Sequence, residues 1–322
     1  MNLVYGRIKV CRTLRAALSL SARLCFILTT SIFSHTTSLM EAKADDYIAP
    51  QLVKVTTPRY KADFEGFTPR LGTYNYVVSW QGIPAASAAV AFGEKDGTYI
   101  VDAKARTNSA IDLLYKLRYQ AVGTLSSFNL KPVKLWIDHR ENSRVKNIDL
   151  QFSGQGDRIT AVRTRVGSTE RKEVSFATTN TLDPIGAGFL ARSLPWAVGD
   201  TKSFDVFNGK SRYLISLTAV DKRVIEFQGT QRECFVISPK VRNLTTTKAV
   251  EKLREAFIFV TTDKFRDVLK IESSVFIGTV LTELESFIPE GAEAPPSDPT
   301  SSTVQLAKSE NNDEVRAQPR IQ

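Results

Sequence analysis

The chain has 322 residues, with 43 Lys or Arg against 34 Asp or Glu and a formal net charge of +9. Six of the basic residues and one acid lie within residues 1–44, so a chain without that segment keeps 37 basic and 33 acidic residues and a net charge of +4. Because the mature chain is nearly balanced, the basic composition of the whole chain does not indicate nucleic-acid binding.

Residues 1–44 have the order of a secretory signal peptide, with a basic start, an apolar stretch over residues 24–33 and a small-residue site at Ala42-Lys43-Ala44. This predicts cleavage between Ala44 and Asp45 and export to the periplasm. A membrane anchor is the competing interpretation, but Arg23 interrupts the apolar run, and about 20 mostly apolar residues are needed to cross a bilayer. No later segment is long and apolar enough, so we expect no membrane span in the mature chain.

The mature chain divides into an N-terminal extension over residues 45–69, one domain over residues 70–287 and a tail over residues 288–322. The domain has a size that a single all-β unit commonly reaches, and no linker-like stretch interrupts it. The tail is rich in Pro, Ser and acidic residues and has few large apolar groups, which predicts a disordered C-terminal tail.

Most of the domain consists of short alternating segments between turn residues, the pattern of antiparallel strands with one buried face. In residues 74–80, Tyr74, Tyr76, Val78 and Trp80 share a face, and residues 81–84 then turn the chain into a second alternating segment. About ten to twelve strands are expected in all.

Helical spacing appears in two short segments. Residues 108–117 place Ile111, Leu114 and Tyr115 on one face, with Ser109 and Asp112 resembling a capping pair. Residues 183–195 begin with an expected N-cap at Asp183 followed by Pro184, and end at Pro195. The spacing of Gly186 and Gly188 lacks the other residues of a phosphate loop, so we attribute these glycines to close packing.

The expected fold is therefore mainly β: a curled antiparallel sheet with one or two short helices. So many strands with so little helix must curl or pack against a second sheet. The alternation of apolar and polar residues assigns the two faces of each strand but does not show whether the sheet closes. A partly open barrel and a sandwich are therefore both compatible with the sequence.

The sequence offers no recognisable catalytic, cofactor or metal site. Cys234 is the only mature cysteine, so no internal disulfide is possible, and His139 is the only mature histidine. A thiol or serine nucleophile would need a base, and neither a Gly-x-Ser-x-Gly motif nor a His/Cys cluster is present. No spacing singles out a pair of carboxylates, so we expect a protein that is not an enzyme. An enzyme that acts on carbohydrate or peptidoglycan through two carboxylates is a further hypothesis, ranked below the two given at the end of this section.

Two features suggest ligand contacts. Arg163 and Arg165 project from one face of a predicted strand within a basic stretch, and could meet anionic headgroups or phosphates, although a solvated strand face is the default. Trp136 alternates out of step with Leu135 and Ile137, so we expect it outside the main core. The basic stretch comprises Arg140, Arg144, Lys146, Arg158, Arg163, Arg165, Arg171 and Lys172.

The sequence resembles the domain-of-unknown-function 3108 family of exported bacterial proteins. The resemblance rests on the order of three motifs: residues 74–85, the Asp183-Pro184 helix followed by residues 196–200, and the closing strands to Phe287. It implies an envelope location and an all-β fold, and it supplies no catalytic residue.

Two functional hypotheses follow. The first is a periplasmic cell-envelope protein that binds an apolar or amphiphilic, lipid-like ligand or maintains the envelope, because a large curved sheet rich in aromatic residues commonly encloses a cavity. The second is an interaction module that docks an envelope protein through a sheet edge or the C-terminal tail.

Overall fold

The computed structural model describes residues 48–153, 158–176, 180–246, 253–275 and 278–292. The predicted cleavage site at Ala44 and Asp45 lies outside the described residues, as does the tail beyond residue 292. The last strand extends to Pro289, slightly into the segment predicted as tail.

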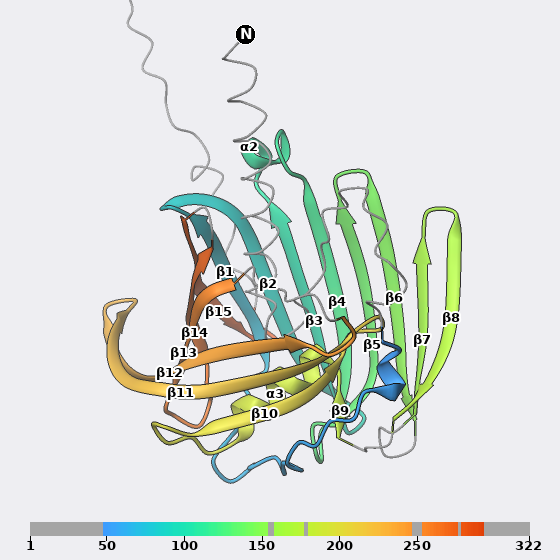
Figure 1. Cartoon of the computed structure of the whole chain (residues 1–322). Coiled ribbons are helices and arrows are strands. Elements are labelled where there is room, and N and C mark those ends of the chain that lie inside the picture. Colours follow the sequence, from blue (N-terminus) through green and yellow to red (C-terminus); the bar gives the residue numbers. More distant parts are fainter. Residues whose placement is uncertain (1–47, 154–157, 177–179, 247–252, 276–277, 293–322) are drawn as a thin grey trace, which may run out of the picture. The chain divides into compact units, whose positions relative to one another are not determined.

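All strands within the described residues belong to one fifteen-stranded sheet (Figure 1). The first half runs in sequence order as an antiparallel meander: β1 (Gly72–Trp80), β2 (Ile83–Lys95), β3 (Thr98–Thr107), β4 (Leu117–Ser126), β5 (Pro132–Glu141), β6 (Arg144–Ser153), β7 (Arg158–Arg165) and β8 (Ser168–Ser175). The second half comprises β9 (Thr181–Leu182), β10 (Thr201–Phe207), β11 (Arg212–Phe227), β12 (Thr230–Asn243), β13 (Leu253–Thr261), β14 (Val268–Val275) and β15 (Gly278–Pro289).

The two halves join where the first and last strands pair. Strand β1 pairs antiparallel with β15 from Gly72 opposite Pro289 to Trp80 opposite Val280. Every strand pair is antiparallel except the short β9, which lies parallel to β10. The sheet therefore ends at β8 on one side and at β9 on the other, and these two strands do not pair. The mainly β, curled antiparallel fold is confirmed, as one open sheet rather than a two-sheet sandwich.

Helix α3 (Pro184–Ser193) lies inside the curl of the sheet (Figure 1). As predicted, Asp183 is its N-cap, and the carboxylate accepts a hydrogen bond from the backbone N–H of Gly186 at 2.8 Å. Every residue of α3 except Arg192 is buried. A side chain at Gly123 of β4 would place its Cβ 2.8 Å from Ile185, so glycine is required for the close approach of strand and helix. We call the face of the sheet that contacts α3 the inner face.

The first predicted helix is much shorter than expected. Helix α2 (Ser109–Asp112) has a single turn, and its N-cap is Asn108, whose side chain makes no capping hydrogen bond. The predicted Ser109–Asp112 capping pair is thus wrong. Asp112 instead accepts from Thr107 and Arg118, each at 2.5 Å, because the ends of β3 and β4 bring those donors beside it. The other short helical turn, η2 (Pro50–Leu52), lies in the N-terminal extension.

The core surrounds α3. Phe92 of β2 stacks on Phe189 of the helix with ring centroids 4.6 Å apart, and Phe204 of β10 is buried in the same cluster. Tyr74, Tyr76 and Val78 are buried on one face of β1 as predicted, while Trp80 at the strand end is half-buried.

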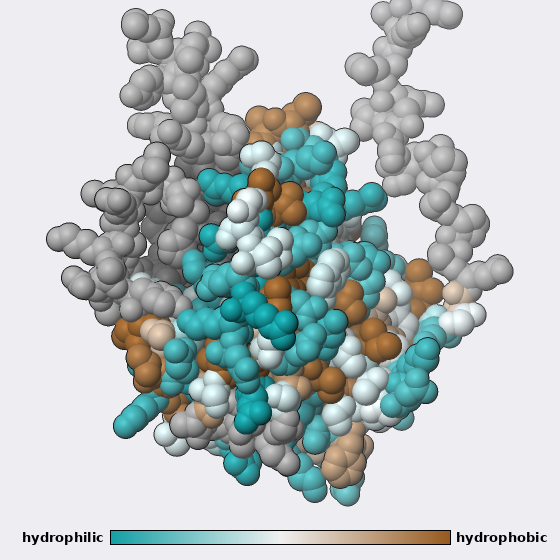
Figure 2. All heavy atoms as spheres, turned by 90° about the vertical axis from the view of Figure 1, so that its right-hand side faces the viewer, coloured by the Kyte–Doolittle hydropathy of each residue, from teal (hydrophilic) through white to brown (hydrophobic). Residues whose placement is uncertain are grey.

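Edge strand β8 carries charged residues along most of its length, including Glu170, Arg171, Lys172 and Glu173. Figure 2 views this side of the molecule and shows hydrophilic residues over much of it, with hydrophobic residues separated among them. Charged side chains on an edge strand disfavour edge-to-edge pairing with strands of other molecules. The edge at β8 is therefore a poor general strand-docking surface.

Titration of Asp183 should make stability depend on pH. Burial raises the pKa of Asp183 to about 7, against partial opposition from the backbone N–H groups of Gly186 and Ile185. The folded chain then holds a proton that the unfolded chain releases, so the free energy of unfolding falls as pH rises from about 4 to about 7. Asp183→Asn keeps a good N-cap without a titrating group. The free energy of unfolding is measured with urea at pH 5 and at pH 8. Its difference between the two pH values should be about 3 kcal/mol smaller in this variant than in the wild type.

Asp200→Asn is the control: the pKa of the half-exposed Asp200 is lowered by its hydrogen bonds to Ala197 and Lys202, so this variant should keep the wild-type difference between pH 5 and pH 8. An Asp183→Asn variant with the full wild-type difference between the two pH values would contradict the assignment.

Candidate functional site

A cavity of about 460 Å³ opens beside α3, within the size range of ligand pockets. One wall is the N-terminal segment over residues 57–64, the second is the β4–β5 connection over residues 127–132, and the third is formed by β9, β10 and Leu190 of α3. Apolar groups dominate the interior: Ala62, Leu130, Pro132, Phe152, Leu182, Leu190 and Phe204. The cavity thus lies where the extension covers one end of the curled sheet.

Specific contacts position the N-terminal wall. The ring of Tyr60 packs 5.1 Å from that of Phe204, and its hydroxyl accepts from the backbone N–H of Ser203 at 3.0 Å. Asn180 donates to the carbonyl of Thr57 at 3.3 Å and accepts from Arg59 at 3.1 Å. The segment is therefore part of the folded domain, and one wall of the cavity depends on it.

A buried ion pair connects the same extension to the sheet. Arg212 binds Asp205 through two hydrogen bonds of 2.6 and 2.5 Å, and its remaining donors reach the carbonyls of Pro50 and Val53. Thr181 of β9 also donates to Asp205 at 2.7 Å. Because a bidentate pair leaves few unsatisfied groups, this charge is tolerated in the interior. It connects η2, β9, β10 and β11.

The mouth of the cavity is cationic and apolar. Among the described residues that line it, the charged ones are Arg59, Lys61 and Lys131, with no Asp or Glu. Phe128 also lines the cavity but is 84% exposed, which places it at the mouth. An apolar interior with basic groups at the entrance suits a molecule with an apolar chain and an anionic end.

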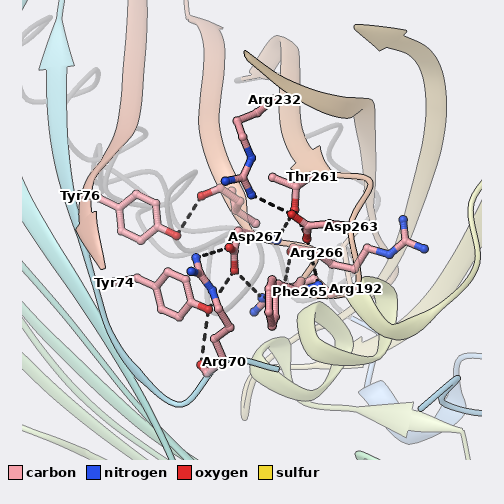
Figure 3. Close-up of polar contacts among 11 residues, drawn as sticks. Arg70, Tyr74, Tyr76, Arg192, Arg232, Thr261, Asp263, Phe265, Arg266 and Asp267 are labelled. Carbon is pink, nitrogen blue, oxygen red and sulfur yellow. Dashed lines mark hydrogen bonds and ion pairs between the residues drawn. The ribbon is translucent and has the colours of Figure 1, made fainter. Parts of the chain in front are cut away.

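A second polar cluster lies at the C-terminal end of α3 (Figure 3). Its centre is Asp267, which is fully buried and accepts from Tyr74 at 2.9 Å and from Arg70. Arg192 lies 3.7 Å from the same carboxylate and donates to the carbonyls of Arg266 and Phe265 at 2.9 and 3.0 Å. Burial raises the pKa of Tyr74, so its hydroxyl stays protonated and serves as a donor.

This cluster has a structural role. The guanidinium of Arg70 lies 4.1 Å from the ring centroid of Phe287 and 5.1 Å from that of Phe265, so aromatic rings surround it. Arg192 satisfies carbonyls in the β13–β14 turn and stacks near Phe189 at 5.2 Å. The cluster therefore joins α3, β1 and the β13–β14 turn, and its charges are used in contacts within the chain.

Cys234 and His139 do not come together as a nucleophile and a base in the part of the chain that the structure describes. Cys234 is buried, and burial raises the pKa of its thiol to about 11, which keeps it protonated. His139 lies 5.7 Å from the ring of Tyr119 in the sheet half formed by β1–β8, whereas Cys234 lies on β12. Within the described ranges, no group of three or more His, Cys, Asp or Glu could hold a metal ion.

The structure separates the predicted contact residues. Trp136 lies on the outer face of β5, half-buried between Val122 and Asp149. Arg163 and Arg165 lie on the inner face of β7, in line with the buried Ile159 and Ala161. Arg163 forms an ion pair with Glu170 and keeps 17% of its side chain exposed. The three residues thus cannot contact one ligand together.

The sequence matches the model of a known protein family. Residues 75–285 match the family model described as "Protein of unknown function (DUF3108)". The chain belongs to this family. The resemblance inferred from the motif order is confirmed, and the match spans the DUF3108 sheet from β1 to β15. No curated protein matches the sequence.

Two solved structures are similar to this DUF3108 chain. One is a β-barrel-like protein of domain of unknown function DUF1849 from Brucella abortus, with 5% identity over 70% of this chain and 100% of that chain and a TM-score of 0.49. The other, described as a "putative lipoprotein" from Parabacteroides distasonis ATCC 8503, has 9% identity over 71% and 100% of the two chains and a TM-score of 0.29. In the described part of the DUF3108 chain, no helix has the length and apolar composition needed to cross a bilayer.

The sequence analysis expected a cavity in the curled sheet but did not locate it. Its walls come from residues 57–64, 127–132 and 180–182, which carry no strong periodicity and lie far apart in the chain. The available signal was weak: aromatic and basic residues alternate in Arg59-Tyr60-Lys61 within the extension of this DUF3108 protein.

Removing the charge of Asp267 should destabilise the fold. Asp267→Asn leaves Arg70 and Arg192 beside a neutral amide, and breaking a buried ion pair from one side typically costs about 3 kcal/mol or more. Urea unfolding followed by circular dichroism should show a correspondingly lower midpoint. The control Asp221→Asn removes an exposed pair with Arg223 and should shift the midpoint far less. Equal shifts in the two variants would contradict the structural role of the cluster.

Proposed function

We propose that this protein is a non-enzymatic component of the bacterial cell envelope that binds an anionic amphiphile in the cavity beside α3. The observation that carries the proposal is the cavity itself, with its apolar interior, three basic residues and no acid among the described lining residues. A fatty-acid-like chain would occupy the apolar interior, and its anionic end would lie near Arg59, Lys61 and Lys131.

Physical chemistry supports this assignment. Apolar surface that leaves water on binding contributes roughly 25 cal/mol per Å². The charged end of the ligand would stay near the mouth, where it keeps water contacts and avoids the cost of burial. Phe128 and Phe64 would cover the part of the chain nearest the opening, because both line the cavity and both are exposed.

Envelope location is part of the same proposal. The N-terminal sequence has the pattern of a secretory signal, and cleavage before Asp45 would release the mature protein into the periplasm. A buried single cysteine suits an oxidising compartment, because Cys234 is inaccessible to other thiols.

Docking of an envelope protein is the second candidate. An exposed apolar tip favours it: Leu113 is 88% exposed, and Ile83 and Leu114 are exposed nearby, where Asn108 bonds the carbonyls of Pro84 and Ala85. The tip lies in the α2 and β1–β2 turns, not on the cavity walls. The two candidates therefore make separate predictions.

A variant at the cavity mouth should weaken amphiphile binding. Phe128→Ser removes apolar surface from the opening, and we expect the Kd for a fluorescent long-chain fatty acid to rise about fivefold, which corresponds to about 1 kcal/mol. Leu113→Ser is the matched control, because it truncates an equally exposed apolar residue at the α2 tip. It should leave the Kd unchanged. Equal Kd values for wild type and Phe128→Ser would contradict binding in this cavity.

The charge preference is tested with the methyl ester of the same fatty acid. The ester should bind more weakly than the acid, and Lys131→Gln should reduce the difference, because the carboxylate loses a charge partner. Native mass spectrometry of protein isolated from the periplasm should also show a mass above that of a chain beginning at Asp45. A bare mass together with no fatty-acid binding would favour the docking module instead.

A further inference from the structure

A second feature of the inner face lies away from the cavity. On the neighbouring strands β6 and β7, Lys146 stands directly opposite Arg165, and Arg163 lies in the next inner-face position of β7. Like charges directly opposite each other in a sheet destabilise it. We call Lys146, Arg163, Arg165 and Lys210 the inner cation cluster.

Lys210 reaches this cluster from the other half of the sheet. It lies in the β10–β11 turn, where Asn208 accepts hydrogen bonds from the backbone N–H groups of Lys210 and Ser211 at 3.1 and 2.9 Å. Gly209 in the same turn has a φ of +88°, and a Cβ there would lie 2.7 Å from Ile148 of β6. The turn is thus packed against β6, and its position over the sheet is fixed.

The four cations share one electrostatic environment. Burial lowers the pKa of Lys210, and the nearby Arg165 and Arg163 lower it further. Burial also lowers the pKa of Lys146, partly opposed by Glu141, with Arg165 and Lys210 acting in the same direction as burial. The two lysines are thus partly desolvated beside the arginines, of which Arg165 is exposed.

Nearby acids do not balance this charge. Inner-face positions of β5–β8 next to the cluster hold two acids, Glu141 and Glu170, and Glu170 is paired with Arg163. Arg144 and Lys172 add two further positive charges on the same face. Arg165 forms no ion pair with a carboxylate in the described part of the chain.

The outer face offers an internal comparison. The other basic residues of the same stretch, Arg140, Arg158 and Arg171, lie on the opposite face, where Arg140 pairs with Asp138 at 2.9 Å and Arg158 with Glu173 at 3.7 Å. Two of these three outer-face arginines thus have an acidic partner. The excess of cations over acids is larger on the inner face.

We infer that the inner cation cluster is a binding site for a phosphate group, distinct from the amphiphile cavity. Arginine forks and lysine ammonium groups are the side chains that bind phosphate oxygens, and a multiply charged anion would relieve the repulsion within the cluster. The site is separate, because Phe152 at the cavity and Lys146 in the cluster lie about 20 Å apart along β6. The phosphate belongs either to a soluble ester or to a lipid headgroup.

Two probes distinguish these sources. Inorganic pyrophosphate is titrated calorimetrically into the mature protein at low salt, and vesicles of phosphatidylglycerol or phosphatidylcholine are tested for protein co-flotation. Whichever of the two probes binds the wild-type protein, we expect Arg165→Gln and Lys210→Gln each to raise its Kd about tenfold. Pyrophosphate binding without flotation assigns a soluble ester, and flotation with phosphatidylglycerol but not phosphatidylcholine assigns a headgroup.

Matched controls exclude a general charge effect. Arg171→Gln on the outer face of β8 and the exposed Lys240→Gln on β12 remove the same charges elsewhere and should leave binding unchanged. Phe128→Ser should also leave pyrophosphate binding unchanged, which separates this site from the cavity. Arg165→Gln should raise the thermal unfolding midpoint, because it removes a repulsive cross-strand pair. Absence of binding to both probes, or equal losses in the control variants, would overturn the inference.

Discussion

One packing constraint underlies the described structure: the ten-residue helix α3 fills the inside of a fifteen-stranded sheet. A helix with one apolar stripe suits one flat partner, whereas α3 has strands on several sides and is buried almost completely. Small residues make this possible. Gly123 lets β4 approach Ile185, and Gly186 lies within 3.5 Å of Leu125 and Pro132, measured from the position a Cβ would take.

Burying a helix on all sides creates a problem at its ends, where backbone groups lack partners. At the N-terminus Asp183 accepts from Gly186, and burial there raises the pKa of its carboxyl group and favours the protonated form. At the C-terminus Arg192 and the Asp267 cluster connect the helix to β1 and the β13–β14 turn. Both ends therefore use ionisable groups to join the helix to the sheet, with no need for catalysis to explain their burial.

The inner face of the sheet divides into three parts along its strands. The apolar core around α3 lies between the cavity, which meets β6 at Phe152, and the inner cation cluster, which meets β6 at Lys146. The core residues Ile148 and Leu150 separate the two, with the β10–β11 turn packed on them. One curled surface thus carries an apolar cavity toward one end of its strands and a group of cations toward the other.

Local sequence patterns determined the mainly β fold, the Asp183 cap and the placement of Arg163 and Arg165 on the same face of one strand. These features depend on neighbours close in the chain. They could not show which face was inner, and Val166, which alternates with Arg165, proved 83% exposed. The length of α2 was also overestimated, because the ends of β3 and β4 recruit Asp112. Only the tertiary structure decided the open sheet, the cavity and the meeting of Lys210 with Arg165. These depend on contacts between segments far apart in sequence, which period and composition do not encode.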